Sequence, residues 1–234
     1  MRVGSLVLLH SPLVGAGSWG RLPEVLRASG YPVAVPSVTA DDSPPYAHRY
    51  IAAATMQLTD ADSMPPLVLV GHSGAGPLLP QLAAAAGAGG QRVGGYVFLD
   101  AGIPRLGADR LALLESEDPA YATGLRNRLD AGGRFPEWSD ADLTAEVPDP
   151  GSRRELVASI RPRGLDYWTE PVPMPADWPD APCGYAQLSP AYDASARQAG
   201  ARGWPVRKLQ LGHFGALAEP ERVAGALLAV LEAM

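Results

Sequence analysis

Short apolar runs alternate along the chain with longer segments whose apolar residues recur at helical spacing. The apolar runs are predicted to be strands, at residues 5–9, 33–35, 67–70, 94–99, 183–188 and 206–211. The segments predicted to be helices between them are residues 19–28, 46–58, 78–86, 191–200 and 221–233, the first with Ser18 as its N-cap. Strands that are apolar throughout are buried on both faces. The pattern therefore predicts an α/β fold with a doubly wound, mainly parallel sheet.

The alternation of predicted strands and helices is interrupted once, between Pro104 and about Asp180. This stretch contains three predicted helical pieces, at residues 109–117, 120–129 and 151–160, separated by turns rich in proline and tryptophan. An insertion of this size between two core strands is expected to cover the ligand site and to line it with aromatic and apolar side chains. We predict an α/β core of residues 1–104 and 179–234 and a helical cap of residues 105–178.

Polar residues follow three of the predicted strands at the point where each strand ends. Ser11 follows the first strand, Ser73 the third and Asp100 the fourth. In parallel sheets, ligands bind at the carboxyl ends of the strands. We therefore expect these three side chains to lie at one edge of the sheet.

The sequence Gly71-His72-Ser73-Gly74-Ala75 stands between a predicted strand and a predicted helix. A serine on such a sharp turn has a strained backbone and projects its hydroxyl above the sheet, while small residues on either side let strand and helix pass closely. The amide of Gly74 would lie at a helix N-terminus, where an oxyanion can be stabilised. A glycine-rich turn without a chemical role is the alternative interpretation.

Other glycine-rich sites fit this turn less well. A phosphate-binding loop requires Lys followed by Ser or Thr after its last glycine, and here Gly76 is followed by Pro77. No G-x-G-x-x-G sequence follows the strand, and no cluster of metal-ligand residues is apparent. We therefore expect no cofactor and no metal.

A serine hydroxyl needs an imidazole to accept its proton and a carboxylate to orient that imidazole. Of the four histidines, His213 follows the last predicted strand and is the candidate base. His72 is expected to point away from Ser73, and His10 is expected to order the loop after the first strand. His48 is expected to be exposed at a helix start.

The order of these motifs resembles the α/β-hydrolase superfamily. The matching segments are an HSP-type loop after the first strand, GHSGAG, LDAGIP, an insertion, and LGHF near the end. The chain looks like the small capped members related to esterases and hydroxynitrile lyases. The resemblance implies an α/β-hydrolase fold, Ser73 as nucleophile, His213 as general base and acid, and the Gly74 N–H as an oxyanion donor.

The chain departs from the family pattern at the carboxylate. In most members the acid lies in the loop after the strand that here is residues 183–188, and Asp193 arrives late in that loop. Asp100, at the tip of the strand beside the serine strand, is the alternative, a placement that some lipases of the superfamily use. We favour Asp100, since a buried aspartate at a rigid strand end needs a partner.

A second departure concerns the oxyanion hole. Its second donor in the family is often the backbone N–H two positions after the histidine that ends the first strand, and here this position is Pro12. Proline has no N–H. The Leu13 N–H or the Ser11 hydroxyl would have to replace it, because losing one donor costs about 10²–10³ in rate.

Three functions follow from these residues. The first is a serine hydrolase that cleaves an ester or thioester of a small, mainly apolar molecule through an acyl-enzyme. The second is a lyase or cyclase that uses His213 as base and Ser73 as a hydrogen-bond partner, which Pro12 favours. The third is a ligand-binding protein on an inactive hydrolase scaffold.

Charge and cysteine content limit the classes of binding partner and the cellular compartment that we expect for this protein. The formal net charge is −6 and no lysine or arginine cluster opposes it, which argues against nucleic acid or an anionic membrane as partner. Asp41, Asp42 and the acidic residues at 115–118 are expected to be solvated surface. Cys183 is the only cysteine, and the apolar run at 3–9 is too short for a signal core, so a cytoplasmic protein is expected. The abundance of Ala, Gly, Pro and Arg suggests a bacterial source. The sequence does not specify the oligomeric state.

Overall fold

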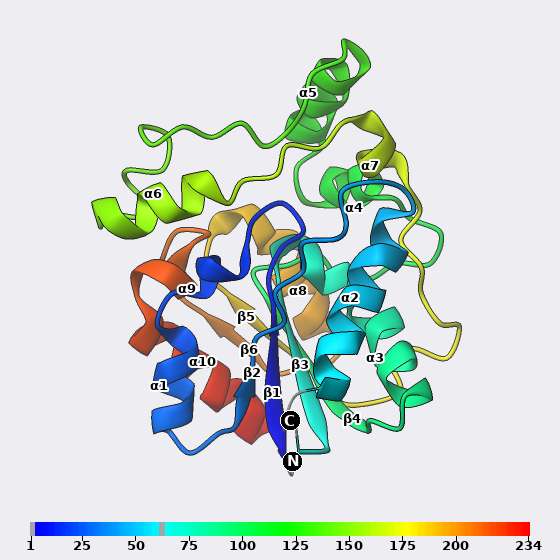
Figure 1. Cartoon of the computed structure of the whole chain (residues 1–234), viewed down its shortest axis with the longest axis vertical. Helices are drawn as coiled ribbons and strands as arrows, with labels where there is room; N and C mark the ends of the chain where they lie inside the picture. The colour runs from blue at the N-terminus through cyan, green and yellow to red at the C-terminus, as the bar shows by residue number, and fades with distance from the viewer. Residues whose placement is uncertain (1–2, 61–63) are drawn as a thin grey trace.

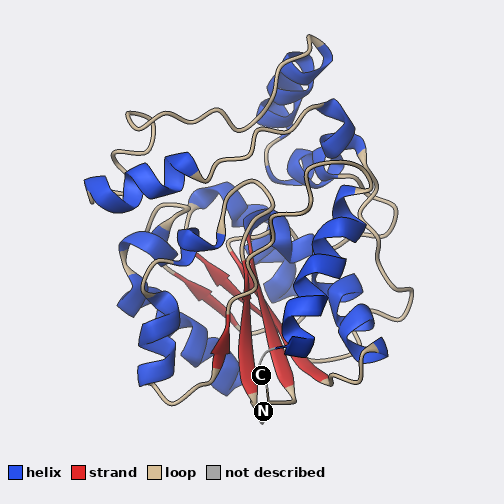
Figure 2. Cartoon of the chain, viewed as in Figure 1, coloured by secondary structure: helices blue, strands red, loops and turns tan. Residues whose placement is uncertain are grey.

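A six-stranded sheet forms the centre of the computed structural model, which describes residues 3–60 and 64–234. The strands are β1 (Ser5–Leu9), β2 (Val33–Ala34), β3 (Leu67–His72), β4 (Val93–Leu99), β5 (Cys183–Gln187) and β6 (Val206–Lys208). They lie in the order β2-β1-β3-β4-β5-β6, and every neighbouring pair is parallel (Figures 1 and 2). The predicted parallel sheet is confirmed. Residues 1–2 and 61–63, which belong to the predicted core, lie outside the described residues.

Helices cover both faces of the sheet, as the apolar strands predict. They are α1 (Leu22–Ala28) and α10 (Pro220–Ala233) on one face, and α2 (Tyr46–Asp60), α3 (Leu79–Ala88) and α8 (Asp193–Ala201) on the other. Successive side chains of β1 alternate between the two layers: Leu6 and Leu8 pack with α1 and α10, while Val7 and Leu9 pack with α2 and α3. All four are fully buried. Burying a leucine or valine side chain contributes about 1.5–3 kcal/mol to the stability of the fold, so the packing on each face of the sheet is stabilising.

Two elements differ from their predicted bounds by three residues at one end. The helix expected from residue 19 begins later, at Leu22, and is preceded by a 3-10 turn (Ala16–Trp19) that contains Ser18. Gly20, with φ of 50°, separates the two, because this backbone conformation interrupts helical geometry. The last strand ends at Lys208 instead of residue 211, since its partner β5 ends at Gln187.

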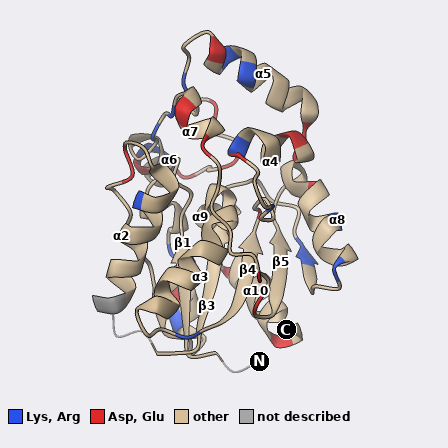
Figure 3. Cartoon of the chain, turned by 90° about the vertical axis from the view of Figure 1, so that its right-hand side faces the viewer, with Lys and Arg blue, Asp and Glu red and all other residues tan. Residues whose placement is uncertain are grey.

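Four helices occupy the stretch between β4 and β5: α4 (Arg110–Glu117), α5 (Pro119–Asp130), α6 (Pro150–Ala158) and α7 (Leu165–Thr169). They lie beyond the carboxyl ends of the strands, and both signs of charge are intermixed on α4 and α5 (Figures 1 and 3). The first three begin within one residue of their predicted starts, and an aspartate caps each one: Asp109, Asp118 and Asp149 accept a hydrogen bond from a first-turn amide. The five-residue helix α7 was not predicted.

Acidic side chains join these helices to the core. Glu170, after α7, accepts hydrogen bonds from the amides of Tyr46 and Ala47 at the start of α2, at 2.8 and 2.7 Å. Glu117, at the end of α4, accepts from the Ser195 amide at 3.1 Å and from its hydroxyl. None of the helices among the described residues is long and apolar enough to cross a bilayer.

Asp41 corrects one sequence prediction. It was expected on the solvated surface, but it is fully buried and pairs with Arg161 at 2.9 Å and with Arg163 at 3.0 Å. Its neighbour Asp42 is exposed, as predicted. The two arginines come from the distant segment after α6, so the local sequence around Asp41 holds no sign of the pairing. Glu117 was also expected at the surface and is partly buried against Ser195.

Candidate active site

Ser73 stands on the predicted sharp turn between β3 and the helix that follows. Its φ is 56°, a left-handed conformation that side-chain-bearing residues seldom adopt, and a 3-10 helix (Ser73–Leu78) precedes α3. Glycines make the turn possible: a Cβ on Gly71 would lie 3.0 Å from the backbone of Gly76, and one on Gly76 would lie 2.7 Å from Ala101 Cβ. The turn therefore packs directly against the end of β4.

Asp100 lies at the tip of β4 and is fully buried, with a φ of 44°. Its Oδ2 accepts hydrogen bonds from His213 Nδ1 at 2.8 Å and from the Ser189 hydroxyl at 2.7 Å. Its Oδ1 accepts from the amides of Leu188 and Ser189, at 2.8 and 2.9 Å. Burial by itself would raise the pKa of Asp100, but the hydrogen bonds from His213 and Ser189 outweigh it and lower the pKa. Asp100 is thus an ionised carboxylate that orients His213.

Asp193, the alternative acid, lies elsewhere. It begins α8, where it accepts a hydrogen bond from Gln187 Nε2 at 2.5 Å and lies 3.8 Å from Lys208 Nζ. The structure brings His213 to Asp100 and shows no hydrogen bond from a described histidine to Asp193.

The Ser73 hydroxyl lies 3.4 Å from the hydroxyl of Tyr192, a residue that sequence reasoning did not select. The ring of Tyr192 also stacks on the ring of His213, with centroids 5.4 Å apart and planes 21° apart. Over the described residues, the structure shows no hydrogen bond between Ser73 and His213; both contact Tyr192 instead. The only signal in the sequence was its place in the loop after the strand at 183–188, where the acid was sought.

His72 contacts His213 and not Ser73. Its Nε2 donates to the His213 carbonyl at 3.0 Å, and the two rings are in contact, with centroids 4.6 Å apart and planes tilted by 30°. Burial, followed by the nearby His213, lowers the pKa of His72 to about 3. This neutral imidazole therefore supports the backbone that carries His213.

Ser11, one of the candidate oxyanion donors, lies beside Gly74. A Cβ placed on Gly74 would lie 3.2 Å from the Ser11 hydroxyl oxygen, 3.4 Å from Pro12 Cδ and 4.0 Å from the Tyr167 hydroxyl. The Leu13 amide donates to the Ser11 hydroxyl at 3.3 Å. Ser11 thus accepts from Leu13 and keeps its own proton for donation next to Gly74.

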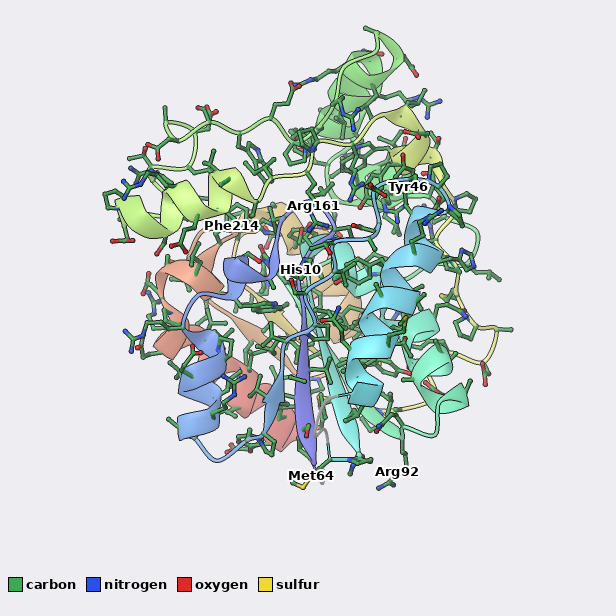
Figure 4. All side chains as sticks on the ribbon, in the orientation of Figure 1. His10, Tyr46, Met64, Arg92, Arg161 and Phe214 are labelled. Atoms are coloured by element: carbon green, nitrogen blue, oxygen red, sulfur yellow. The ribbon has the colours of Figure 1, made fainter. Side chains whose placement is uncertain are left out.

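The segment after α6 holds the loop that carries Ser11. The Arg161 amide donates to the Leu13 carbonyl at 2.9 Å, and Arg163 Nη2 donates to the Pro12 carbonyl at 3.3 Å. The same two arginine side chains bind Asp41. Figure 4 shows Arg161 and His10 at one end of the sheet, with Met64 and Arg92 at the other.

His10 and His48 have the positions expected of them. His10 is buried; its Nδ1 donates to the Ser11 carbonyl at 2.9 Å and its Nε2 accepts from the Val38 amide at 3.1 Å. Burial lowers its pKa, in keeping with a neutral ring that orders the loop. His48 is exposed on α2.

Two cavities flank α4 instead of lying over Ser73. One, of about 270 Å³, lies between α4 and α8 and is lined in part by Glu117 and Ser195. The other, of about 300 Å³, lies between α4 and α5. No group of three or more potential His, Cys, Asp or Glu metal ligands occurs within the described ranges.

The sequence profile of the alpha/beta hydrolase family matches residues 6–226. Three similar solved structures are an extracellular alpha/beta-hydrolase from a Paenibacillus species, a pyrethroid hydrolase from Sphingobium faniae, and tomato Methylketone Synthase I in complex with beta-ketoheptanoate. Their identities are 16%, 20% and 14%, and their TM-scores 0.71, 0.71 and 0.72. The alignments cover 97%, 99% and 100% of this chain and 98%, 98% and 99% of theirs. These likenesses show a common fold. No curated protein sequence matches significantly.

Proposed function

Because the chain belongs to the alpha/beta hydrolase family and is an enzyme of the hydrolase type, we propose that it cleaves esters or thioesters of small, mainly apolar molecules. Ser73 is the nucleophile, His213 the general base and acid, and Asp100 the orienting carboxylate. The observation that carries the proposal is the 2.8 Å hydrogen bond from His213 Nδ1 to buried Asp100, one strand away from the strained Ser73 turn.

The reaction proceeds through an acyl-enzyme. Asp100 fixes the proton of His213 on Nδ1, so Nε2 is free to accept the Ser73 proton as the hydroxyl attacks the substrate carbonyl. Protonated His213 then gives this proton to the leaving oxygen or sulfur, and the acyl group stays on Ser73. A water molecule, deprotonated by His213, releases the acid and restores the hydroxyl.

We assign the oxyanion donors to the Gly74 amide and the Ser11 hydroxyl. Of the two replacements for the missing Pro12 N–H, the Leu13 amide already donates to Ser11. Ser11 has a free proton and its oxygen lies beside Gly74. A rigid donor aimed at the developing charge is worth about 2.7–4 kcal/mol of transition-state stabilisation.

The helices of residues 105–178 form the cap in this proposal. Their Tyr167 hydroxyl reaches the neighbourhood of Gly74. Around it lies an apolar cluster formed by Leu13, Tyr46, Leu111, Leu125, Leu129, Tyr167 and Trp168. An aromatic and aliphatic cluster that reaches the Gly74 turn supports a small, mainly apolar substrate, in line with the similar structure named a pyrethroid hydrolase.

Covalent labelling tests the proposal. A fluorophosphonate probe should modify the folded protein at Ser73, and p-nitrophenyl butyrate should be hydrolysed; Ser73→Ala should lose both. The matched control is Ser189→Ala, which removes a hydroxyl from the site without removing the nucleophile and should still be labelled. A folded protein that takes no label and turns over no ester contradicts the proposal and favours a ligand-binding role on the same scaffold.

A lyase or cyclase reaction with His213 as base is the second candidate, favoured by Pro12 at the usual donor position. Such a reaction forms no acyl-enzyme, so it does not require a complete oxyanion hole. Turnover that survives in Ser73→Ala but is lost in His213→Ala would establish it.

A further inference from the structure

Tyr192 contacts both reacting groups of the proposed site. Its hydroxyl lies 3.4 Å from the Ser73 oxygen, and its ring stacks on His213 with nearly parallel planes. The distance is long for a bond between hydroxyls, which are usually about 2.7–2.8 Å apart. The contact is therefore weak, and the Tyr192 proton is available to a better acceptor that enters the site.

The position of Tyr192 is set by the same carboxylate that orients His213. Tyr192 ends a 3-10 turn (Pro190–Tyr192), and its amide donates to the Ser189 carbonyl at 3.5 Å. Ser189 is itself held to Asp100 through its amide and its hydroxyl. Asp100 thus fixes the imidazole on one side and the base of the tyrosine turn on the other. Such a rigid connection is what a group with a role in the reaction requires.

We propose that Tyr192 is a catalytic residue that donates a hydrogen bond first to Ser73 and then to the leaving-group atom of the substrate. This inference rests on the proposed hydrolysis. In the free enzyme the Tyr192 O–H points at the Ser73 oxygen, which leaves the proton of Ser73 for His213. Tyr192 keeps its own proton throughout, and the proton that reaches the leaving group is the one that His213 took from Ser73.

The switch between acceptors follows from the tetrahedral intermediate. In that intermediate the Ser73 oxygen and the leaving atom are bonded to the same carbon, so a donor beside one is close to the other. The Ser73 oxygen becomes a weaker acceptor once it is bonded to carbon, whereas negative charge develops on the leaving atom as its bond breaks. The better acceptor is then the leaving atom, and its stabilisation appears only in the transition state.

The tyrosine suits this role because it remains neutral. Burial raises the pKa of Tyr192 well above its ordinary value, and the negative charges of Asp100 and Glu117 act in the same direction, while the hydrogen bond between Tyr192 and Ser73 opposes them. At physiological pH the group is therefore a hydrogen-bond donor and never a phenolate base. Proton removal from Ser73 is left to His213.

Tyr192→Phe tests the role because it removes the hydroxyl and keeps the ring on His213. The readout is kcat/KM, which includes the steps through departure of the leaving group. Substrates are a series of phenyl acetates of increasing leaving-group pKa, with ethyl acetate as a poor leaving group. We expect p-nitrophenyl acetate to change by less than about threefold, because nitrophenolate leaves without help, and ethyl acetate to fall by about 10–100-fold.

Two control variants separate the hydroxyl from other effects. Tyr31→Phe removes a hydroxyl from a partly exposed tyrosine that precedes β2, at the amino-terminal end of the sheet, and should leave the whole series unchanged. Tyr192→Leu removes both the hydroxyl and the ring, and should lower kcat/KM for all substrates because His213 loses its stacking partner. Thermal unfolding of each variant establishes that it is folded.

The outcomes are distinct. A fall in Tyr192→Phe that steepens with leaving-group pKa supports the assignment. An equal fall for every ester, or none, overturns it and leaves Tyr192 as a packing residue. If the folded wild-type protein hydrolyses no ester and takes no fluorophosphonate label, the hydrolase proposal itself has failed, and the tyrosine role fails with it.

Discussion

The carboxylate of Asp100 binds His213, Ser189 and two backbone amides, whereas that of Asp193 contacts a glutamine and a lysine near the surface. Asp100→Asn should therefore lower kcat for p-nitrophenyl butyrate by about 10³–10⁴-fold, because an amide cannot hold His213 in the required tautomer. Asp193→Asn, the matched control, should stay within about threefold. Comparable kcat values for the two variants would contradict the assignment.

His72 makes stability dependent on pH. Its pKa is about 3 in the folded protein and near its ordinary 6.5 in the unfolded chain, so between these values the unfolded state binds more protons. The free energy of unfolding should therefore fall as pH falls below about 6.5. At pH 5 the loss from this residue is about 2 kcal/mol, at about 1.36 kcal/mol per pH unit.

His72→Gln isolates this contribution. Urea unfolding at pH 7 and pH 5 should show a smaller acid-induced loss of stability in the variant than in the wild type, since glutamine does not titrate. His10, also buried with a lowered pKa, is present in both proteins and cancels in the comparison. An equal pH dependence in the two proteins would assign the acid loss to other groups.

At the scale of elements, the segment after α6 fixes the loop that carries Ser11. Asp41 links Arg161 and Arg163, and Arg163 is itself buried. Asp41→Asn leaves buried positive charge without its partner, so the free energy of unfolding should fall by about 3–5 kcal/mol. Asp42→Asn, at the exposed neighbour, should change it by less than about 0.5 kcal/mol. Denaturant unfolding of the two variants measures the difference.

The strands around the site were predictable because a strand covered on both faces is apolar throughout, and strand ends locate Ser11, Ser73 and Asp100 at one edge. The helix α7 could not be predicted, since its five residues are too few to show a helical period. The contacts of Tyr192 and of the buried Asp41 were not predicted, for a different reason. Tyr192 contacts Ser73 across 119 residues of sequence and Asp41 binds Arg161 across 120, and neither residue lies in a motif whose spacing records those contacts.

At the scale of the whole molecule, the Glu170 carboxylate joins the helices above the strands to the start of α2. Glu170 accepts hydrogen bonds from the amides of Tyr46 and Ala47, where a carboxylate also interacts favourably with the helix dipole, and its Oε1 lies 3.9 Å from the buried Arg110. Glu170→Gln removes the charge from this junction. The substitution leaves the positive charge of Arg110 less well neutralised and weakens the hydrogen bond from the Tyr46 amide.

We therefore expect Glu170→Gln to loosen the junction without unfolding the sheet. Amide hydrogen exchange in α7 and in the first turn of α2 should accelerate by about tenfold, the equivalent of 1.4 kcal/mol of lost local stability, while β1 and β3 keep wild-type protection. Glu115→Gln, at an exposed position on α4, should change neither region. Uniform acceleration through the sheet would instead mean that these helices and the core open as one cooperative unit, because local release requires that the core strands stay closed.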